Sequence, residues 1–263
     1  MRLLLTSMVC CVATVLGAAT IDVDYAKVRD GSIGAALNAT LATAAAAGEV
    51  VPDPLVACQR VLITWSGPKQ PPIVRFLGVD TAVYCARLVA SDAVSIDTKF
   101  GTAYALPKQQ GFAVVALSDN ELLMAPPALL ATIEAPVWPE LTTNVISFSG
   151  PATDLKLGDL QDELKEFVFA WEPTGAISLH ATANSKSDAK AVLRYISLRE
   201  PLLDAAAALG VDKAQFPAKL LDATTFDRQN NVVIARLDLD EPTRVQAIDY
   251  LADQIRKQMR KYH

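Results

Sequence analysis

The alternation of hydrophobic and polar positions predicts a mixture of short strands and helices along the chain. Apolar residues at every second position indicate strands, and apolar residues at every third or fourth position indicate helices. In the first half, the pattern predicts a helix at 32–47, strands at 60–65 and 72–77, a helix at 80–90 and a β-rich stretch at 93–106. These elements belong to a mixed α and β protein.

A hairpin followed by proline and a helix occurs in each half. The first copy comprises strands at 112–117 and 121–125 around the polar turn Ser118-Asp119-Asn120, then Pro126-Pro127 and a short helix at 128–133. The second copy comprises strands at 223–227 and 232–239 and the last helix at 241–260. Two apolar runs on either side of a short polar turn are typical of β-hairpins.

The rest of the second half continues the same mixture. It comprises a strand at 144–149, a helix from Asp154 to Leu164, a hairpin of 167–171 with 176–183, and helices at 188–199, 202–209 and 213–221. Antiparallel hairpins with helices packed against them are typical of the α+β class. We therefore expect an α+β fold of two units, each with antiparallel β-hairpins packed against helices.

These segments carry a resemblance to a known group of proteins. The hairpin at Val114–Ala125 with its proline pair and helix, and the hairpin at Thr225–Leu239 with the long C-terminal helix, resemble uncharacterised exported bacterial proteins built from two α+β units. The likeness covers about residues 60–260. It includes no catalytic motif and implies no role for any single residue.

The boundary between the expected units is marked by prolines. Pro136 and Pro139 lie in a segment with little periodicity, which favours a connection between domains. We expect an N-terminal unit at 20–136, a linker at 137–143 and a C-terminal unit at 144–263. Trp138 lies within this linker, and its large apolar ring predicts that the segment packs against a surface.

The first 19 residues have the order of a signal peptide. Arg2 precedes an apolar run from Leu3 to Leu16, and the small residues at 17–19 follow. The run is shorter than the roughly 20 residues that span a membrane. We expect cleavage after Ala19, or after Ala18. The mature protein is then exported to the periplasm, the cell envelope or the exterior. Before cleavage, residues 1–19 should form a detached helix. Lipid attachment at Cys10 and an uncleaved membrane anchor are alternatives.

The net charge argues against one class of partner, and the cysteine content predicts one covalent bond. The formal net charge of −5 makes nucleic acid an unexpected partner. Cys58 and Cys85 remain after the expected cleavage, and an even pair of cysteines in an exported chain favours a disulfide bond. The alternative is two buried thiols that pack as small hydrophobic side chains.

Few residues are suited to catalysis or metal binding. The chain has two histidines, one of them the terminal His263, and it lacks a Cys-x-x-Cys pair, a phosphate-binding glycine loop and a Gly-x-Ser-x-Gly elbow. We therefore assign no catalytic residue, no cofactor and no metal site. The alternation of its strand places His180 on an outer face with Ser178 and Thr182. Ser178 and His180 are two residues apart on one strand, about 6–7 Å between Cα atoms, and their side chains run parallel. This geometry is unsuited to a hydrogen bond between a nucleophile and its base, so we expect a solvated histidine.

Three further groups have two interpretations each. Phe167, Phe169 and Trp171 form an aromatic stripe, which favours core packing over a ligand platform. The carboxylates at 238, 240 and 241 favour capping of the last helix, with Asp240 as N-cap, over calcium binding. The basic end of that helix, at 256–261, favours a solvated helix terminus over contact with an anionic membrane. Asp22 and Asp24 are expected to be solvated.

Two functional hypotheses remain. The first is a non-enzymatic exported protein that serves as a binding or structural module of the cell envelope. The second is an exported hydrolase that uses paired carboxylates in an interdomain groove near Trp138. The ligand, the partners and the oligomeric state do not follow from the sequence.

Overall fold

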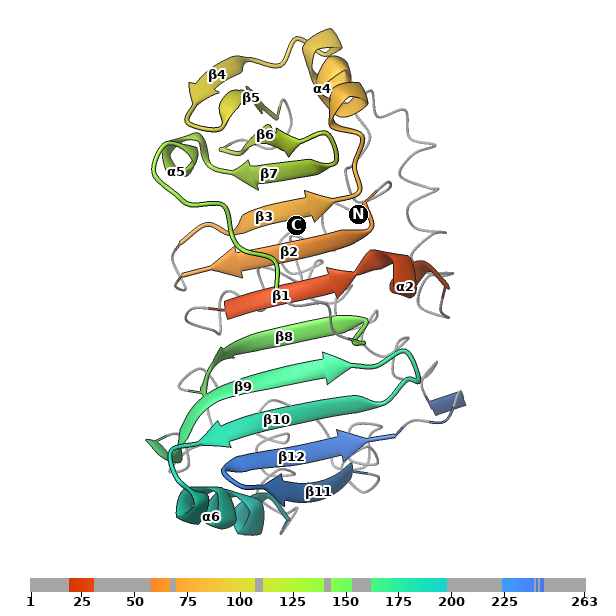
Figure 1. Ribbon diagram of the computed structural model, residues 1–263, viewed down its shortest axis with the longest axis vertical. Helices are drawn as coiled ribbons and strands as arrows, with labels where there is room; N and C mark the ends of the chain where they lie inside the picture. Colours follow the sequence, from red (N-terminus) through yellow and green to blue (C-terminus); the bar gives the residue numbers. More distant parts are fainter. Residues whose placement is uncertain are drawn as a thin grey trace, which may run out of the picture. The chain divides into compact units, whose positions relative to one another are not determined.

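The computed structural model has an α+β fold built from antiparallel strands and a few helices (Figure 1). It describes residues 19–30, 58–66, 70–106, 111–139, 143–152, 162–197, 224–238, 240 and 242–243. The chain divides into two compact units, and the boundary lies between Ile146 and Ser147. Each unit is described by itself.

Unit 1 is an antiparallel sheet with short helices. Its strands are β1 (Ala19–Asp24), β2 (Arg60–Trp65), β3 (Ile73–Leu77), β4 (Ser95–Thr98), β5 (Gly101–Ala105), β6 (Ala113–Ser118) and β7 (Glu121–Ala125). Its helices are α2 (Tyr25–Asp30), α4 (Thr81–Ala90) and α5 (Pro127–Leu130). The strands follow the order β1-β2-β3-β7-β6-β5-β4, with each neighbouring pair antiparallel.

Local sequence signals explain where α4 begins and predict several strands of unit 1. Asp80 caps α4 because its carboxylate accepts a hydrogen bond from the backbone N–H of Val83 at 3.0 Å. The predicted strand at 60–65 and the predicted hairpin at 112–125 are both confirmed, the latter as β6 paired with β7. One hydrophobic cluster lies along β5, β6, β7 and α5 and is formed by Ala103, Ala113, Val115, Leu123, Ala125 and Leu130.

Unit 2 contains a second set of antiparallel strands and one longer helix. Its elements are β8 (Ile146–Pro151), which begins at the unit boundary, β9 (Leu164–Trp171), β10 (Ile177–Ala183), α6 (Lys186–Ser197), β11 (Thr224–Gln229) and β12 (Val232–Leu237). The strand order is β11-β12-β10-β9-β8. The predicted hairpins are confirmed as β9 with β10 and β11 with β12.

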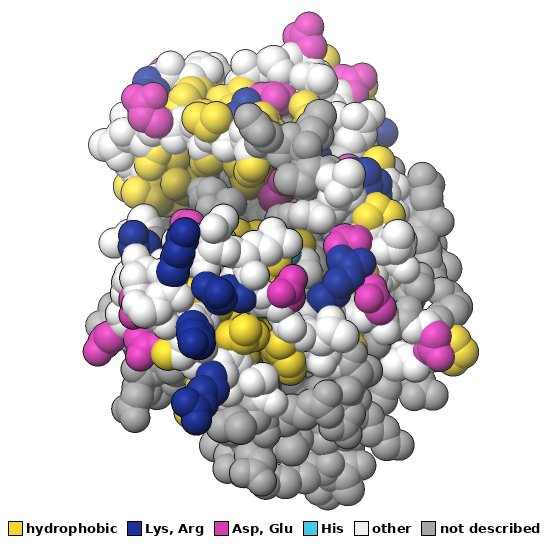
Figure 2. Space-filling model, turned by 60° about the horizontal axis from the view of Figure 1, so that its bottom comes forward, with side chains coloured by type: hydrophobic (Ala, Val, Ile, Leu, Met, Phe, Trp, Pro, Cys, Tyr) yellow, Lys and Arg dark blue, Asp and Glu magenta, His cyan; other side chains and the backbone are white. Residues whose placement is uncertain are grey.

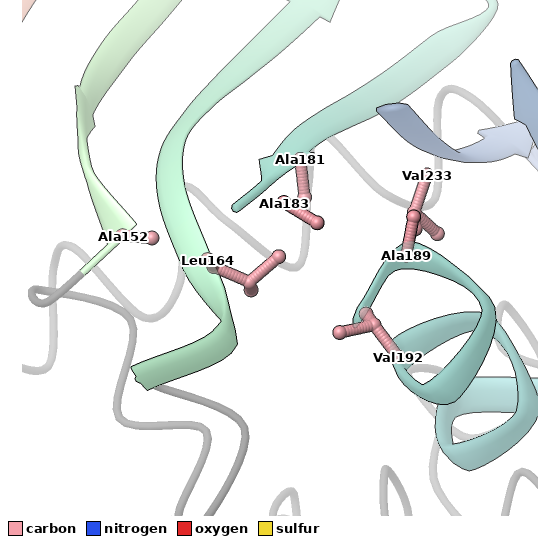
Figure 3. Close-up of a cluster of buried hydrophobic side chains, with 7 residues drawn as sticks. All are labelled: Ala152, Leu164, Ala181, Ala183, Ala189, Val192 and Val233. Carbon is pink, nitrogen blue, oxygen red and sulfur yellow. The ribbon is translucent and has the colours of Figure 1, made fainter. Parts of the chain in front are cut away.

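The core of unit 2 lies between α6 and the sheet. Ala189 and Val192 of α6 lie in one buried cluster with Ala181 and Ala183 of β10, and Figure 3 shows Ala189 beside Val233 of β12. Ala152 and Leu164 complete the cluster. Ser185 starts the helix, because its hydroxyl accepts a hydrogen bond from the backbone N–H of Asp188 at 3.1 Å.

Leu164 corrects one predicted element. The sequence pattern placed it at the end of a helix that starts at Asp154, but it is the first residue of β9, opposite Ala183. Leu164 is buried in the cluster that also contains Ala189 and Val192 of α6, and its apolar side chain lies on the face of the sheet that carries this cluster. Residues 154–161 of that predicted helix lie outside the described residues, as do the predicted helices at 32–47, 202–209 and 213–221 and most of the last helix.

The N-terminal prediction is only partly covered. Residues 1–18 lie outside the described part of the chain, so the expected detached helix is not described. Ala19 is the first residue of β1, opposite Trp65 of β2. Among the described helices, none is both long and apolar enough to span a membrane.

Candidate functional site

A group of charged side chains shares one face of the unit 1 sheet. Leu62 of β2 lies opposite Asp22 on one side and Arg75 on the other. Residues directly opposite in an antiparallel sheet point to the same face, and so do residues two apart in one strand. Arg60, two residues before Leu62, therefore lies on the face that carries Asp22 and Arg75.

Asp22 and Arg60 form a buried two-pronged ion pair. The Nε atom of Arg60 donates to Oδ1 of Asp22 at 2.8 Å, and Nη2 donates to Oδ2 at 2.6 Å. Asp22 is 9% exposed and Arg60 is 6% exposed. The hydrogen bonds that Arg60 donates to Asp22 raise the pKa of Arg60 above its ordinary value. This parallel arrangement is the strongest geometry for an arginine–carboxylate pair.

The sequence-based expectation of a solvated Asp22 is therefore wrong. β1 pairs with β2, and this pairing brings Asp22 to a partner that lies 38 residues later in the chain. A carboxylate is buried in this way only where a cation compensates it. Asp24 is more exposed, and it pairs with Lys27 at 2.8 Å.

Glu121 and Arg75 form a second pair on the same face. Glu121 lies opposite Leu77, which in turn lies opposite Arg60. Nη2 of Arg75 donates to Oε2 of Glu121, and Nη1 donates to the carbonyl oxygen of Pro136 at 2.6 Å. The Nε atom of Arg75 is buried and has no hydrogen-bond partner among the described residues.

Trp138 connects the two ion pairs. The guanidinium carbons of Arg60 and Arg75 lie 5.0 and 5.1 Å from the centroid of its ring, which is the range of a cation–π interaction. Its indole Nε1 donates to Oε1 of Glu121 at 3.1 Å. The prediction that Trp138 packs against a surface is confirmed. We call Asp22, Arg60, Arg75, Glu121 and Trp138 the arginine clamp.

The arginine clamp holds an irregular segment onto the sheet. The carbonyl oxygen of Pro139 accepts a hydrogen bond from Nη2 of Arg60 at 3.0 Å, and that of Pro136 is held by Arg75. We call Pro136–Pro139 the strap. Within the strap, Val137 is 85% exposed. The sheet therefore fixes the strap at both ends and through Trp138, while Val137 extends into solvent.

The arginine clamp is suited to structural support. Both carboxylates accept hydrogen bonds from guanidinium groups, which stay protonated at every physiological pH. A carboxyl that acts as a general acid or base must exchange its proton with a substrate. In the part of the chain that the structure describes, the carboxylates that contact Arg60, Arg75 and Trp138 are those of Asp22 and Glu121, and each of them is bound to an arginine.

Cys58 and Cys85 are not joined by a disulfide bond, which corrects the prediction from cysteine pairing. Cys58 precedes β2, whereas Cys85 lies on α4, which packs on β5 and β6. β3 and β7 lie between β2 and β6, and three strand spacings of about 4.8 Å amount to about 14 Å. A disulfide requires Cα atoms within about 7 Å. Burial raises the pKa of the Cys85 thiol.

The protein, unfolded without reductant, should alkylate at both Cys58 and Cys85. Iodoacetamide in denaturant should add one carbamidomethyl group to each cysteine, measured by mass spectrometry of tryptic peptides. In the native protein Cys85 should react more slowly than in denaturant, because its raised pKa keeps the thiol protonated. A disulfide-linked peptide containing both cysteines would contradict the structure.

The strand face that carries His180 is less exposed to solvent than the sequence predicts. His180 is half-buried, opposite Val168 of β9 and Ile234 of β12. Ser178, which we expected to be exposed beside it, is 3% exposed. The sheet of unit 2 is therefore covered at Ser178 on the side facing away from α6. On the opposite side, Val233 is buried.

Phe167 of the aromatic stripe packs in the core and Asp240 caps the last helix, as the sequence predicts. Phe167 is 1% exposed, and its ring lies 5.2 Å from that of Phe148, so it packs in the core as predicted. Asp240 caps the start of the last helix, because its Oδ1 accepts a hydrogen bond from the backbone N–H of Thr243 at 2.9 Å. Asp238 is paired with Arg236 at 3.1 Å. Among the described residues, no three His, Cys, Asp or Glu side chains gather as a metal site.

Comparison with known proteins gives matches only to solved structures. No protein-family model matches the chain. No curated protein matches it either. The chain is similar to crystal form I of TP0453, with 12% identity, a TM-score of 0.45, and coverage of 90% of this chain and 94% of that chain. Crystal form III of TP0453 gives 10% identity, a TM-score of 0.42, and coverage of 90% and 95%.

Proposed function

We propose that the chain is an exported, non-enzymatic protein that serves as a binding or structural module of the cell envelope. It comprises a signal peptide at 1–19 and two α+β units. The order of Arg2, an apolar run and small residues supports export. A cut after Ala19 would leave Thr20–Asp24 paired with β2, so the mature chain would begin within the sheet.

The observation that carries the non-enzymatic proposal is the arginine clamp. The hydrolase alternative requires one carboxyl to donate a proton and another to accept one or to attack the substrate. Among the described residues, the carboxylates that contact the arginines around Trp138 are Asp22 and Glu121, and each is bound to an arginine. The cluster supports a rigid scaffold, which is what a binding or structural module requires.

Export predicts the mass of the natural protein. The first residue of the protein isolated from its source should be Thr20, or Ala19 if the peptidase cuts one residue earlier. Intact-mass spectrometry of that protein, with peptide mapping of its N-terminus, measures this directly. A natural protein that begins at Met1 would contradict export through a cleaved signal.

The non-enzymatic role predicts no hydrolysis that depends on the clamp carboxylates. Purified wild type should release no more nitrophenol from a panel of p-nitrophenyl glycosides and esters than the Glu121→Gln variant. That variant retains the shape of the side chain but removes its charge. Turnover by the wild type that the variant lacks, with both proteins folded by circular dichroism, would favour the hydrolase.

A further inference from the structure

The outward face of α6 carries a straight row of positive charge. Lys186, Lys190 and Arg194 follow one another at intervals of four residues, and all three are exposed. Four residues of helix rise by about 6 Å, so the three charges are evenly spaced along one side of the helix. When the end that carries α6 in Figure 1 is turned toward the viewer, Figure 2 shows a row of Lys and Arg side chains.

Arg228 of β11 extends this row at the start of the helix. Its Nη1 donates to the carbonyl oxygen of Lys186 at 3.5 Å and to that of Asn230 at 3.0 Å. Among the described residues, no carboxylate forms an ion pair with any of these four cations. Asp188, the acidic residue of α6, is half-buried in the first turn, where its charge complements the helix dipole. We call Lys186, Lys190, Arg194 and Arg228 the basic row.

Folding alone does not favour the basic row. Like charges four residues apart repel each other on a helix surface, and the Lys186–Lys190 and Lys190–Arg194 pairs both have this spacing. Lys186 and Arg228 also lie at the N-terminal end of α6, where the helix dipole disfavours cations. These repulsions cost stability in the isolated protein, and a bound polyanion would relieve them.

The rest of the helix limits the kind of partner. Ala189 and Val192 bury the apolar side of α6 against its own sheet, so no apolar helix face is available to enter a bilayer. Tyr195 is 43% exposed, and helical spacing places the small residues Ser187 and Ala191 between its ring and the row. A line of cations beside an exposed aromatic ring fits a linear chain of charged sugars, with carboxylates on the cations and a sugar ring on Tyr195.

We propose that the basic row and Tyr195 bind a linear anionic polysaccharide, a proposal that rests on the envelope location inferred above. The partner class is a polymer of sugars that carry carboxylate groups at regular intervals. Binding is electrostatic at the row, so its affinity falls as salt rises, because the polymer releases counterions when the cations replace them.

The binding experiment uses the purified full chain and polygalacturonate as the probe, with neutral dextran as the control polymer. Titration calorimetry should detect binding to polygalacturonate and none to dextran. The Lys186→Gln/Arg194→Gln double variant should bind roughly tenfold more weakly, since two exposed ion pairs are lost. Tyr195→Ala should weaken binding without changing the salt dependence.

A matched double variant separates the basic row from net charge. Arg87→Gln/Lys99→Gln removes the same two charges from exposed positions in unit 1 and should retain wild-type affinity. Equal weakening in both double variants would overturn the proposal, as would no binding by the wild type. Binding to phosphatidylglycerol vesicles without binding to polygalacturonate would overturn it in favour of a membrane surface.

A stability measurement gives an independent readout. Lys190→Glu converts both repulsive pairs of the row into attractive ones, so the melting temperature should rise while polygalacturonate binding falls at least tenfold. A structural role for Lys190 would instead lower the melting temperature. The N-terminal mass test addresses export alone, so a failure of the export proposal and a failure of this one are distinguishable.

Discussion

Asp22→Ala should destabilise the protein by about 3–5 kcal/mol, because it leaves the charge of Arg60 buried without its carboxylate. Arg60 would retain its hydrogen bond to Pro139, but both bonds to Asp22 would be lost. Urea denaturation followed by circular dichroism measures the change. Arg60→Met in addition should recover part of the loss, because it removes the uncompensated charge.

Asp24 provides the matched control on the same strand. Its carboxylate accepts a hydrogen bond from the backbone N–H of Lys27 at 3.1 Å and pairs with the side chain of Lys27 near the surface. Asp24→Ala should therefore cost about 1 kcal/mol, the usual effect of a lost helix cap. Equal losses at Asp22 and Asp24 would show that the buried ion pair does not hold the sheet.

Trp138→Ala should cost about 2–3 kcal/mol. The indole ring is half-buried, contacts two guanidinium groups and donates a hydrogen bond to Glu121. Val137→Ala, one residue earlier and 85% exposed, should change stability by less than about 0.5 kcal/mol. Thermal melts of the two variants compare them directly.

Trp138→Phe tests the origin of the effect. Phenylalanine retains a ring over the guanidinium groups but lacks the indole N–H, so the loss should be about 1 kcal/mol. A Trp138→Ala loss no larger than that of Val137→Ala would show that the strap is not held by the arginine clamp.

Local sequence signals predicted the features that depend on neighbouring residues. The turn at 118–120 predicted the β6–β7 hairpin, and Asp240 was predicted as a cap from its place before the last helix. Both signals act within a few residues of the chain. The α+β class followed from the same patterns.

The features that sequence patterns missed depend on which strands lie side by side. Nothing near Asp22 indicates that its partner is Arg60, because that contact follows from the pairing of β1 with β2. The disulfide was predicted by counting cysteines, but strand order separates Cys58 from Cys85. Trp138 was expected to pack, yet its arginine partners come from β2 and β3, which residue type alone does not identify.

The strap also sets the order in which unit 1 is completed during synthesis. Arg60 bonds to Asp22 near the start of the chain and to Pro139, which lies 79 residues after it. The backbone N–H of Asp24 also donates to the carbonyl oxygen of Val145 at 2.9 Å. These contacts cannot form until the chain has been made as far as residue 145, and contacts of such long sequence separation form slowly. A nascent chain shorter than this can pair β1 with β2 but lacks the contacts that hold Arg60 to Pro139 and Asp24 to Val145.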